Sequence, residues 1–300
     1  TTCGLSFSMR LLKNDTFSEK EVQDSVKSLQ TRNHINHLGI LDVYGSRYEV
    51  DNESLPLVRP VLAAMRQLVG NDAEHNKIFV GVGYYYYNDT DAWTSLAKTA
   101  LTLVAKDVDV LVVISTIVSV PSHSECMTLA LNSLKSSQAL TPNMQSAFSM
   151  ATEIYGRSSM MVAFALQMGV VMYNLTTTYK LAANALHAPC NAFALTDYSQ
   201  ACQAKAVEVR AEKSMVAINS IDSARILNKT VFQTFDTVKL MKYKAKVIMN
   251  RPGRRSNFSW FLFNVELTDV TGECLKGGPF ERVKEFKKFY VDEVPKGPAG

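Results

Sequence analysis

The segment Lys242–Leu267, KYKAKVIMNRPGRRSNFSWFLFNVEL, concentrates basic and aromatic side chains. No acidic residue stands between Asp236 and Glu266. Lysine and arginine can contact phosphates, and exposed aromatic rings can stack on bases of any sequence. The segment therefore predicts contact with single-stranded nucleic acid in a sequence-tolerant manner. The candidate binding residues are Lys242, Lys244, Lys246, Arg251, Arg254, Arg255, Tyr243 and Trp260.

A β-hairpin is the element predicted to position these side chains. Lysines alternate with Tyr243, Ala245 and Val247, and a strand with this period would place three ammonium groups on one face. Arg-Pro-Gly-Arg-Arg at 251–255 has turn chemistry, and the aromatic run at 257–267 favours a second strand. Two alternatives stay open: a solvated lysine face that discourages edge pairing, and an arm that exchanges with a neighbouring subunit.

Other motifs that could do chemistry are incomplete. His123-Ser-Glu125 and Pro189-Cys190 would suit part of the ligand-and-acid set of zinc deaminases, but position 193 is Phe where a second cysteine is required. Gly81-Val-Gly83 is half of a dinucleotide-binding turn and lacks the third glycine. We therefore predict no catalytic residue, no metal site and no cofactor.

The charge distribution agrees with a polyanionic partner. Residues 230–300 carry 13 Lys and Arg against 8 Asp and Glu, a net charge of +5. The preceding 229 residues carry 19 against 20, a net charge of −1. The whole positive charge of the chain therefore belongs to its C-terminal quarter, which favours an acidic partner there.

Composition indicates a folded globular chain. The 300 residues are 47% hydrophobic and 20% charged, which excludes disorder and a biased fibre. The longest apolar runs, 109–120 and 160–175, are shorter than the roughly 20 residues that cross a bilayer. No membrane span is predicted.

Cysteine usage and sequons bear on location. The five cysteines at 3, 126, 190, 202 and 274 are odd in number and widely spaced, which favours reduced thiols in an intracellular or virion-associated protein. Six Asn-x-Ser/Thr sequons occur, a mild excess over chance, and Asn174 is expected inside an apolar helix that could hardly carry a glycan. The sequons are at Asn14, Asn52, Asn88, Asn174, Asn228 and Asn257.

The predicted fold class is α+β, with a mixed α/β N-terminal region, a predominantly helical centre, and a C-terminal β-hairpin with an extended tail. Residues 1–120 form the mixed region, with a helix at about 18–32, a short helix at about 59–70, and strand, helix and strand over 77–120. Residues 121–235 form the helical core, with helices over 141–156, 160–186 and 200–227. Residues 236–300 form the basic hairpin and a tail with one short amphipathic helix.

The sequence favours a non-enzymatic structural subunit that binds nucleic acid and assembles into a homo-oligomer, of the nucleocapsid or coat-protein kind. An α/β enzyme with a small-molecule pocket near residues 81–91 is the first alternative. A secreted glycoprotein is the second alternative.

Overall fold

The computed structural model describes residues 4–8, 19–33, 35–45, 55–70, 76–84, 89–118, 126–135, 138–155, 160–180, 185–202, 207–210, 221–227, 230–253, 258–274 and 278–293. The chain forms two compact units. The first unit comprises 1–114, 149–164 and 257–259, and the second comprises 115–148, 165–256 and 260–300.

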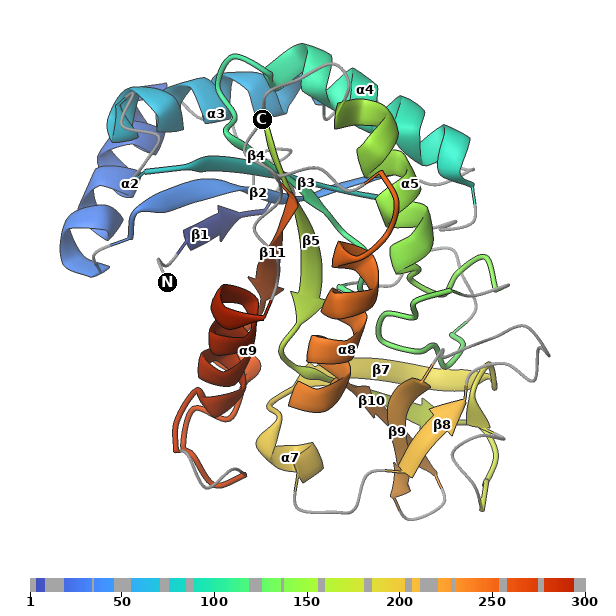
Figure 1. Ribbon diagram of the computed structural model, residues 1–300. Helices are drawn as coiled ribbons and strands as arrows, with labels where there is room; N and C mark the ends of the chain where they lie inside the picture. The colour runs from blue at the N-terminus through green and yellow to red at the C-terminus, as the bar shows by residue number, and fades with distance from the viewer. Residues whose placement is uncertain are drawn as a thin grey trace. The chain divides into compact units, whose positions relative to one another are not determined.

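A parallel sheet runs through the first unit (Figure 1). Its strand order is β1-β2-β3-β4-β5-β11, and the ladders from β1 to β5 are all parallel. The strands β5 and β11 begin in the first unit and end in the second. The bounds are β1 Gly4–Phe7, β2 His37–Gly45, β3 Ile78–Tyr84, β4 Val110–Val113, β5 Met161–Gln167 and β11 Phe258–Phe263.

The central strands of this sheet are buried on both faces. Every residue of β3 and β4 is buried, as expected for parallel strands covered by helices. Gly39 and Gly81 allow β2 and β3 to approach closely: a Cβ on Gly39 would lie 2.0 Å from the carbonyl oxygen of Phe79, and one on Gly81 would lie 2.8 Å from Cα of Leu41. Larger residues at either glycine would displace the backbone.

Helices follow the strands of the first unit. These are α2 (Glu19–Asn33), α3 (Leu55–Val69) and α4 (Thr90–Val104). The helix α4 begins where Asp89 accepts a hydrogen bond from the backbone N–H of Ala92 at 3.1 Å, and it buries Trp93 and Leu96 along one face. The alternation of strand and helix with parallel ladders is the pattern of an α/β protein.

An antiparallel sheet lies in the second unit, with strand order β7-β6-β10-β9-β8. Its strands are β6 Val170–Leu175, β7 Cys190–Thr196, β8 Val207–Arg210, β9 Ile221–Leu227 and β10 Val231–Phe235. On β6, Val171, Tyr173 and Leu175 pack into the core, while Met172 and Asn174 are more exposed. Val170 and Met172 pack against Tyr198 and Phe235 on the other face, so β6 is covered on both faces at its start and opens to solvent at Asn174.

The remaining helices are α5 (Met144–Tyr155), α7 (Ser199–Cys202), α8 (Val238–Met249), the short 3₁₀ helix η1 (Val265–Leu267) and α9 (Glu281–Asp292). The first turn of α8 is capped by Thr237, whose hydroxyl accepts a hydrogen bond from the Leu240 N–H at 3.3 Å. Within the described residues, no helix combines the length and apolarity that crossing a membrane requires.

The predicted α+β fold class is wrong, because the predicted helical centre contains strands. The range 160–186 holds β5 and β6, and the range 200–227 holds β8 and β9. The apolar run of β5 shows no alternation because nearly every residue in it is buried, and so it resembles a buried helix in sequence.

The predicted C-terminal hairpin is also wrong. Its first half is the helix α8, whose buried residues recur at spacings of three and four: Leu240, Met241, Lys244, Ala245, Ile248 and Met249. This helical period outweighs the lysine alternation, because burial of the stripe decides the conformation. The predicted strand–helix–strand order over 77–120 and the helices α2, α5 and α9 are confirmed.

Candidate functional site

The carboxyl ends of parallel strands are where α/β proteins bind their ligands. The residues that follow β4 and the ends of β5 and β11 meet in the second unit. The Gln167 side-chain amide at the end of β5 donates to the carbonyl of Ile117, just after β4, at 3.2 Å. The Met168 N–H donates to the carbonyl of Phe263, the last residue of β11, at 2.9 Å. We call Ser115, Thr116, Gln167, Phe263 and Asn264 the strand-end site.

The strand-end site is uncharged. Ser115, Thr116 and Gln167 are fully buried, and the Thr116 hydroxyl donates to the carbonyl of Leu131 at 3.3 Å. The Ser115 hydroxyl has no hydrogen-bond partner within the part of the chain that the structure describes. Phe263 and Asn264 are partly exposed. A neutral polar ligand could therefore reach the Phe263 ring and the Asn264 amide, while the buried Ser115, Thr116 and Gln167 side chains hold the strand ends in place.

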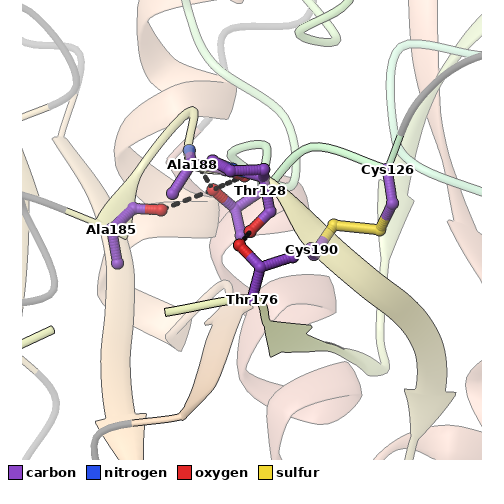
Figure 2. The surroundings of a disulfide bond; sticks show 7 residues. Cys126, Thr128, Thr176, Ala185, Ala188 and Cys190 are labelled. Carbon is purple, nitrogen blue, oxygen red and sulfur yellow. Dashed lines mark hydrogen bonds between the residues drawn. A yellow bond between two sulfur atoms is a disulfide. The ribbon is translucent and has the colours of Figure 1, made fainter. Parts of the chain in front are cut away.

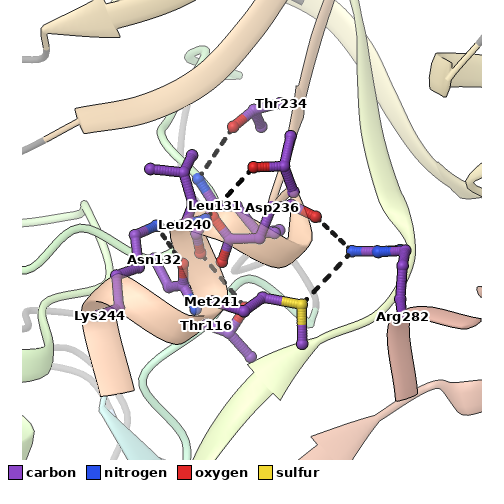
Figure 3. Close-up of polar contacts among 10 residues, drawn as sticks. Thr116, Leu131, Asn132, Thr234, Asp236, Leu240, Met241, Lys244 and Arg282 are labelled. Carbon is purple, nitrogen blue, oxygen red and sulfur yellow. Dashed lines mark hydrogen bonds and ion pairs between the residues drawn. The ribbon is translucent and has the colours of Figure 1, made fainter. Parts of the chain in front are cut away.

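A buried charge cluster lies where β10 meets α8 (Figure 3). It consists of Asn132, Asp236, Lys244 and Arg282, all of which are at most 1% exposed. The Lys244 ammonium lies 2.8 Å from Oδ1 of Asp236 and 2.8 Å from Oδ1 of Asn132. The charges of Lys244 and Asp236 compensate each other, which a buried ion requires.

Arg282 enters the cluster from α9. It donates to the backbone carbonyl of Met168 at 2.6 Å and to the backbone carbonyl of Asp236. Its guanidinium lies over the ring of Tyr198, 3.7 Å from the ring centroid. Burial lowers the pKa of Arg282 and raises the pKa of Tyr198, and the nearby Arg282 charge opposes the rise at Tyr198. Arg282 thereby joins the end of β5 to the start of α8.

Two more carboxylates of the second unit hold turns. Asp269 accepts backbone N–H bonds from Gly272, Glu273 and Cys274, at 3.0, 3.0 and 2.7 Å. Asp197 accepts the Ser199 N–H at 2.7 Å, at the start of α7. These carboxylates fix backbone geometry.

A disulfide joins Cys126 to Cys190 on β7 (Figure 2). Beside it, the Thr128 hydroxyl bonds to the carbonyls of Ala185 and Ala188 and accepts the Ala188 N–H at 2.9 Å. Cys274 is disulfide-bonded as well. The sequence prediction of reduced thiols is wrong for these three cysteines, because residues distant in the chain are brought together by the fold.

The structure describes six of the eight predicted nucleic-acid-binding residues and separates them. Lys244 is buried in the charge cluster, Lys242 pairs with Glu285 at 2.8 Å, and Lys246 is exposed on α8. Lys242 and Lys246 are four residues apart and share one face of α8, whereas Lys244 lies on the opposite, buried face. Tyr243 is a half-buried residue of the same helix.

The other predicted residues lie beyond α8. Arg251 lies over the ring of Phe148, 5.4 Å from the centroid. Trp260 belongs to β11 and packs edge-on against Phe286 at 6.0 Å. Arg254 and Arg255 lie outside the described residues. The described members therefore do not form one face of a hairpin.

Sequence reasoning missed Asn132, Asp236 and Arg282, and it misread Lys244. The available signal was the position of Lys244 within an apolar stripe at helical spacing, since a lysine in such a stripe needs a buried partner. In the described part of the chain, no three His, Cys, Asp or Glu side chains gather as metal ligands.

No protein-family model matches this sequence, and no curated protein matches it either. The fold is similar to solved chitinases and chitinase-like proteins. A human pseudo-chitinase with retained chitooligosaccharide binding, YKL-39, is 14% identical, with a TM-score of 0.62 over 97% of this chain and 80% of that one. An immunomodulatory active chitinase from Trichuris suis is 13% identical, with a TM-score of 0.58 over 94% and 76% of the two chains.

A third similar structure is the chitinase-like agglutinin of Robinia pseudoacacia. It is 14% identical, with a TM-score of 0.51 over 92% of this chain and 75% of the agglutinin. The likeness establishes a TIM-barrel-like α/β fold. The same fold serves an active enzyme, a pseudo-enzyme and an agglutinin, so the fold leaves enzymatic activity open.

The coat-protein interpretation and its nucleic-acid partner are wrong. The similar proteins are chitinases and proteins that bind chitooligosaccharides. The alternative of an α/β enzyme fits the fold better than the main interpretation does. The error arose because the basic residues were assigned to one strand, whereas burial and ion pairing occupy two of the lysines.

Proposed function

We propose that this protein binds chitin-type oligosaccharides, polymers of β-linked N-acetylglucosamine, without hydrolysing them. One observation carries the non-hydrolytic part. The sequence has no Asp or Glu from 110 to 124 or from 154 to 196. These ranges include β4, β5, β6 and the residues directly after each of them.

Glycoside hydrolysis needs carboxyl groups beside the scissile bond. In most families one protonates the leaving-group oxygen and a second acts as base or nucleophile. A substrate-assisted reaction still needs a proton donor within hydrogen-bond reach of that oxygen. None of the five residues of the strand-end site is a carboxylic acid that could act as this donor. The nearby Asp236 is fully buried and paired with Lys244, so it is not placed to meet a substrate.

Oligosaccharide binding, unlike hydrolysis, does not need a carboxyl group beside the glycosidic bond. Sugar rings present apolar faces to aromatic side chains, and hydroxyl and acetamido groups exchange hydrogen bonds with amides and hydroxyls. Phe263 and Asn264 are partly exposed at the carboxyl end of β11 and offer both kinds of contact. The fold is shared with a pseudo-chitinase that retains chitooligosaccharide binding.

Calorimetric titration with N-acetylglucosamine oligomers tests the binding. We expect saturable binding that Phe263→Ala weakens about tenfold or more, because truncating an aromatic anchor removes its contact area. Phe280→Ala is the matched control, since Phe280 is an exposed aromatic residue of the same unit. An absence of binding by the folded wild-type protein would refute the proposal.

A product assay tests the absence of hydrolysis separately. Incubation with N-acetylglucosamine oligomers should yield no shorter oligomers, as read by mass spectrometry. Turnover that survives purification and scales with protein concentration would overturn the non-hydrolytic part and leave the binding part standing.

We also propose an oxidising compartment for this protein. Disulfides persist mainly in secreted and extracytoplasmic proteins, and Cys126, Cys190 and Cys274 are disulfide-bonded. The intracellular location inferred from the sequence is the competing prediction. Thiol alkylation of the protein from its native source distinguishes the two, since the oxidising compartment requires these cysteines to resist alkylation until they are reduced.

A further inference from the structure

We propose that Asn174 is an N-glycosylation site. Asn174-Leu175-Thr176 is a sequon, and it is the only one of the six whose asparagine lies within the described residues. The inference rests on the oxidising compartment proposed above and goes beyond oligosaccharide binding, because the glycan here is covalent. A sequon can carry a glycan in the folded protein only where its asparagine side chain is exposed to solvent.

The strand β6 presents Asn174 to solvent. Tyr173 and Leu175 on either side of it are buried in the core of the second unit, so the alternation of the strand turns Asn174 outward. The Asn174 side chain is exposed. The expectation that this residue lies in an apolar helix is therefore wrong, and with it the reason for discounting the sequon.

Small neighbours leave room for a sugar. Asn174 lies opposite Ala192 on β7 and opposite Val231 on β10. Ala192 and Ala194 are both exposed and end at Cβ. The first N-acetylglucosamine can therefore stand on this face without displacing a large side chain.

The face of the sheet that carries Asn174 is open beside this residue. Ala192 and Ala194 are exposed, while Met172 is half-buried against the core cluster of Val170, Tyr198 and Phe235. The exposed side chains next to Asn174 on β7 are therefore small.

The disulfide stands close to the sequon in the sheet. Leu175 pairs with Cys190, which is bonded to Cys126, and the Thr176 hydroxyl donates to the carbonyl of Pro189 at 3.2 Å. Disulfide formation and glycan transfer occur in the same oxidising secretory compartment of eukaryotic cells. The two modifications are therefore chemically compatible on neighbouring residues.

The transfer is a substitution without redox change. The donor is a lipid-linked oligosaccharide pyrophosphate supplied by the cell that secretes the protein. A bond forms between Nδ2 of Asn174 and the anomeric carbon of the donor's N-acetylglucosamine, while the bond from that carbon to the pyrophosphate oxygen breaks. The amide nitrogen loses one proton, and the lipid pyrophosphate leaves with the bonding electrons.

Peptide mapping of the full chain, secreted from insect cells behind a heterologous leader, tests the site. Trypsin releases residues 158–180, in which Asn174 is the only asparagine. We expect this peptide to appear unglycosylated only after treatment with peptide N-glycosidase, with Asn174 converted to heavy-oxygen-labelled Asp. Asn174→Gln and Thr176→Ala should each remove one glycan from the intact mass, whereas Thr176→Ser should retain it.

Asn191→Gln is the matched control, because Asn191 is exposed on the adjacent strand outside any sequon and should leave the glycan mass unchanged. Unmodified Asn174 in a secreted protein whose Cys126–Cys190 disulfide is formed would overturn the glycan alone. Unmodified Asn174 together with reduced cysteines would overturn both the glycan and the proposed compartment. Neither outcome bears on oligosaccharide binding, which calorimetry of the Asn174→Gln protein measures separately.

Discussion

Lys242 and Lys244 lie on opposite faces of helix α8, and each forms an ion pair in a different environment. Lys242 and Lys244 each lie 2.8 Å from a carboxylate, that of Glu285 and that of Asp236 respectively. The Lys242 and Glu285 side chains are 29% and 38% exposed, whereas Lys244 and Asp236 are each 1% exposed. The lysine, the helix and the distance to the carboxylate are shared, so the largest difference between the two pairs is their exposure to solvent.

Solvent changes what each ion pair contributes. Water screens the exposed pair, and ordering two long side chains offsets most of the remaining attraction. In the buried pair, desolvation is costly for each ion, so each depends on its partner. Geometry alone would rank the two pairs as equal, whereas burial makes one structural and the other nearly dispensable.

The largest effect is expected from Lys244→Ala. Removing the ammonium leaves the Asp236 carboxylate buried without its counter-charge, which should lower the free energy of unfolding by about 3–5 kcal/mol. Urea unfolding followed by circular dichroism measures the loss. Lys246→Ala, the same change at an exposed position of α8, controls for helix propensity and should be close to neutral.

A paired replacement sharpens this result. Lys244→Met combined with Asp236→Leu removes both charges together and should recover most of the stability lost in Lys244→Ala. The buried-pair interpretation fails if Lys244→Ala costs no more than Lys246→Ala, or if the double replacement is no better than the single one.

Arg282→Lys should have an intermediate effect. A lysine keeps the positive charge but lacks the planar guanidinium that donates to the carbonyls of Met168 and Asp236 together. It also cannot stack on the Tyr198 ring as the guanidinium does. We expect unfolding to become easier by about 2–3 kcal/mol, since one hydrogen bond to a charged group is lost in a buried site. Lys284→Arg, an exposed change two residues along α9, is the control. If Arg282→Lys were as stable as the wild type, a positive charge at position 282 would be enough for stability, and the guanidinium contacts would not matter.

Local pattern was sufficient to predict part of this fold. The capped helix α4 and the β-rich segments of β3 and β4 were recognisable because each is both locally regular and fully packed. The strand β5 was not recognised, because Met, Ala and Leu in a strand buried on both faces give no period, and β6 was interpreted as a continuation of the same apolar run. The α8 segment was misread because three alternating lysines were given more weight than the stripe from Leu240 to Met249.

The candidate site was beyond reach of the sequence. It joins Ile117 to Gln167 and Met168 to Phe263, and no local pattern specifies contacts across such separations. The pairing of Cys126 with Cys190 is likewise a product of the fold. The sequence does show directly that residues 154–196 contain no Asp or Glu.

The smallest effect is expected from Lys242→Ala, and its pH dependence gives the comparison its most specific test. The hydrogen bond and charge of Lys242 lower the pKa of Glu285. A carboxyl group with a lowered folded-state pKa contributes stability above its unfolded pKa, near 4.5, and that contribution disappears as pH falls through the folded value. The small stability difference between wild type and Lys242→Ala should therefore be present at neutral pH, close on acidification below about 4.5, and shrink in high salt. Urea midpoints of the two proteins across this range, compared with Lys246→Ala, measure it. A difference that widens on acidification, or that matches the loss in Lys244→Ala, would mean that exposure does not distinguish the two faces of α8.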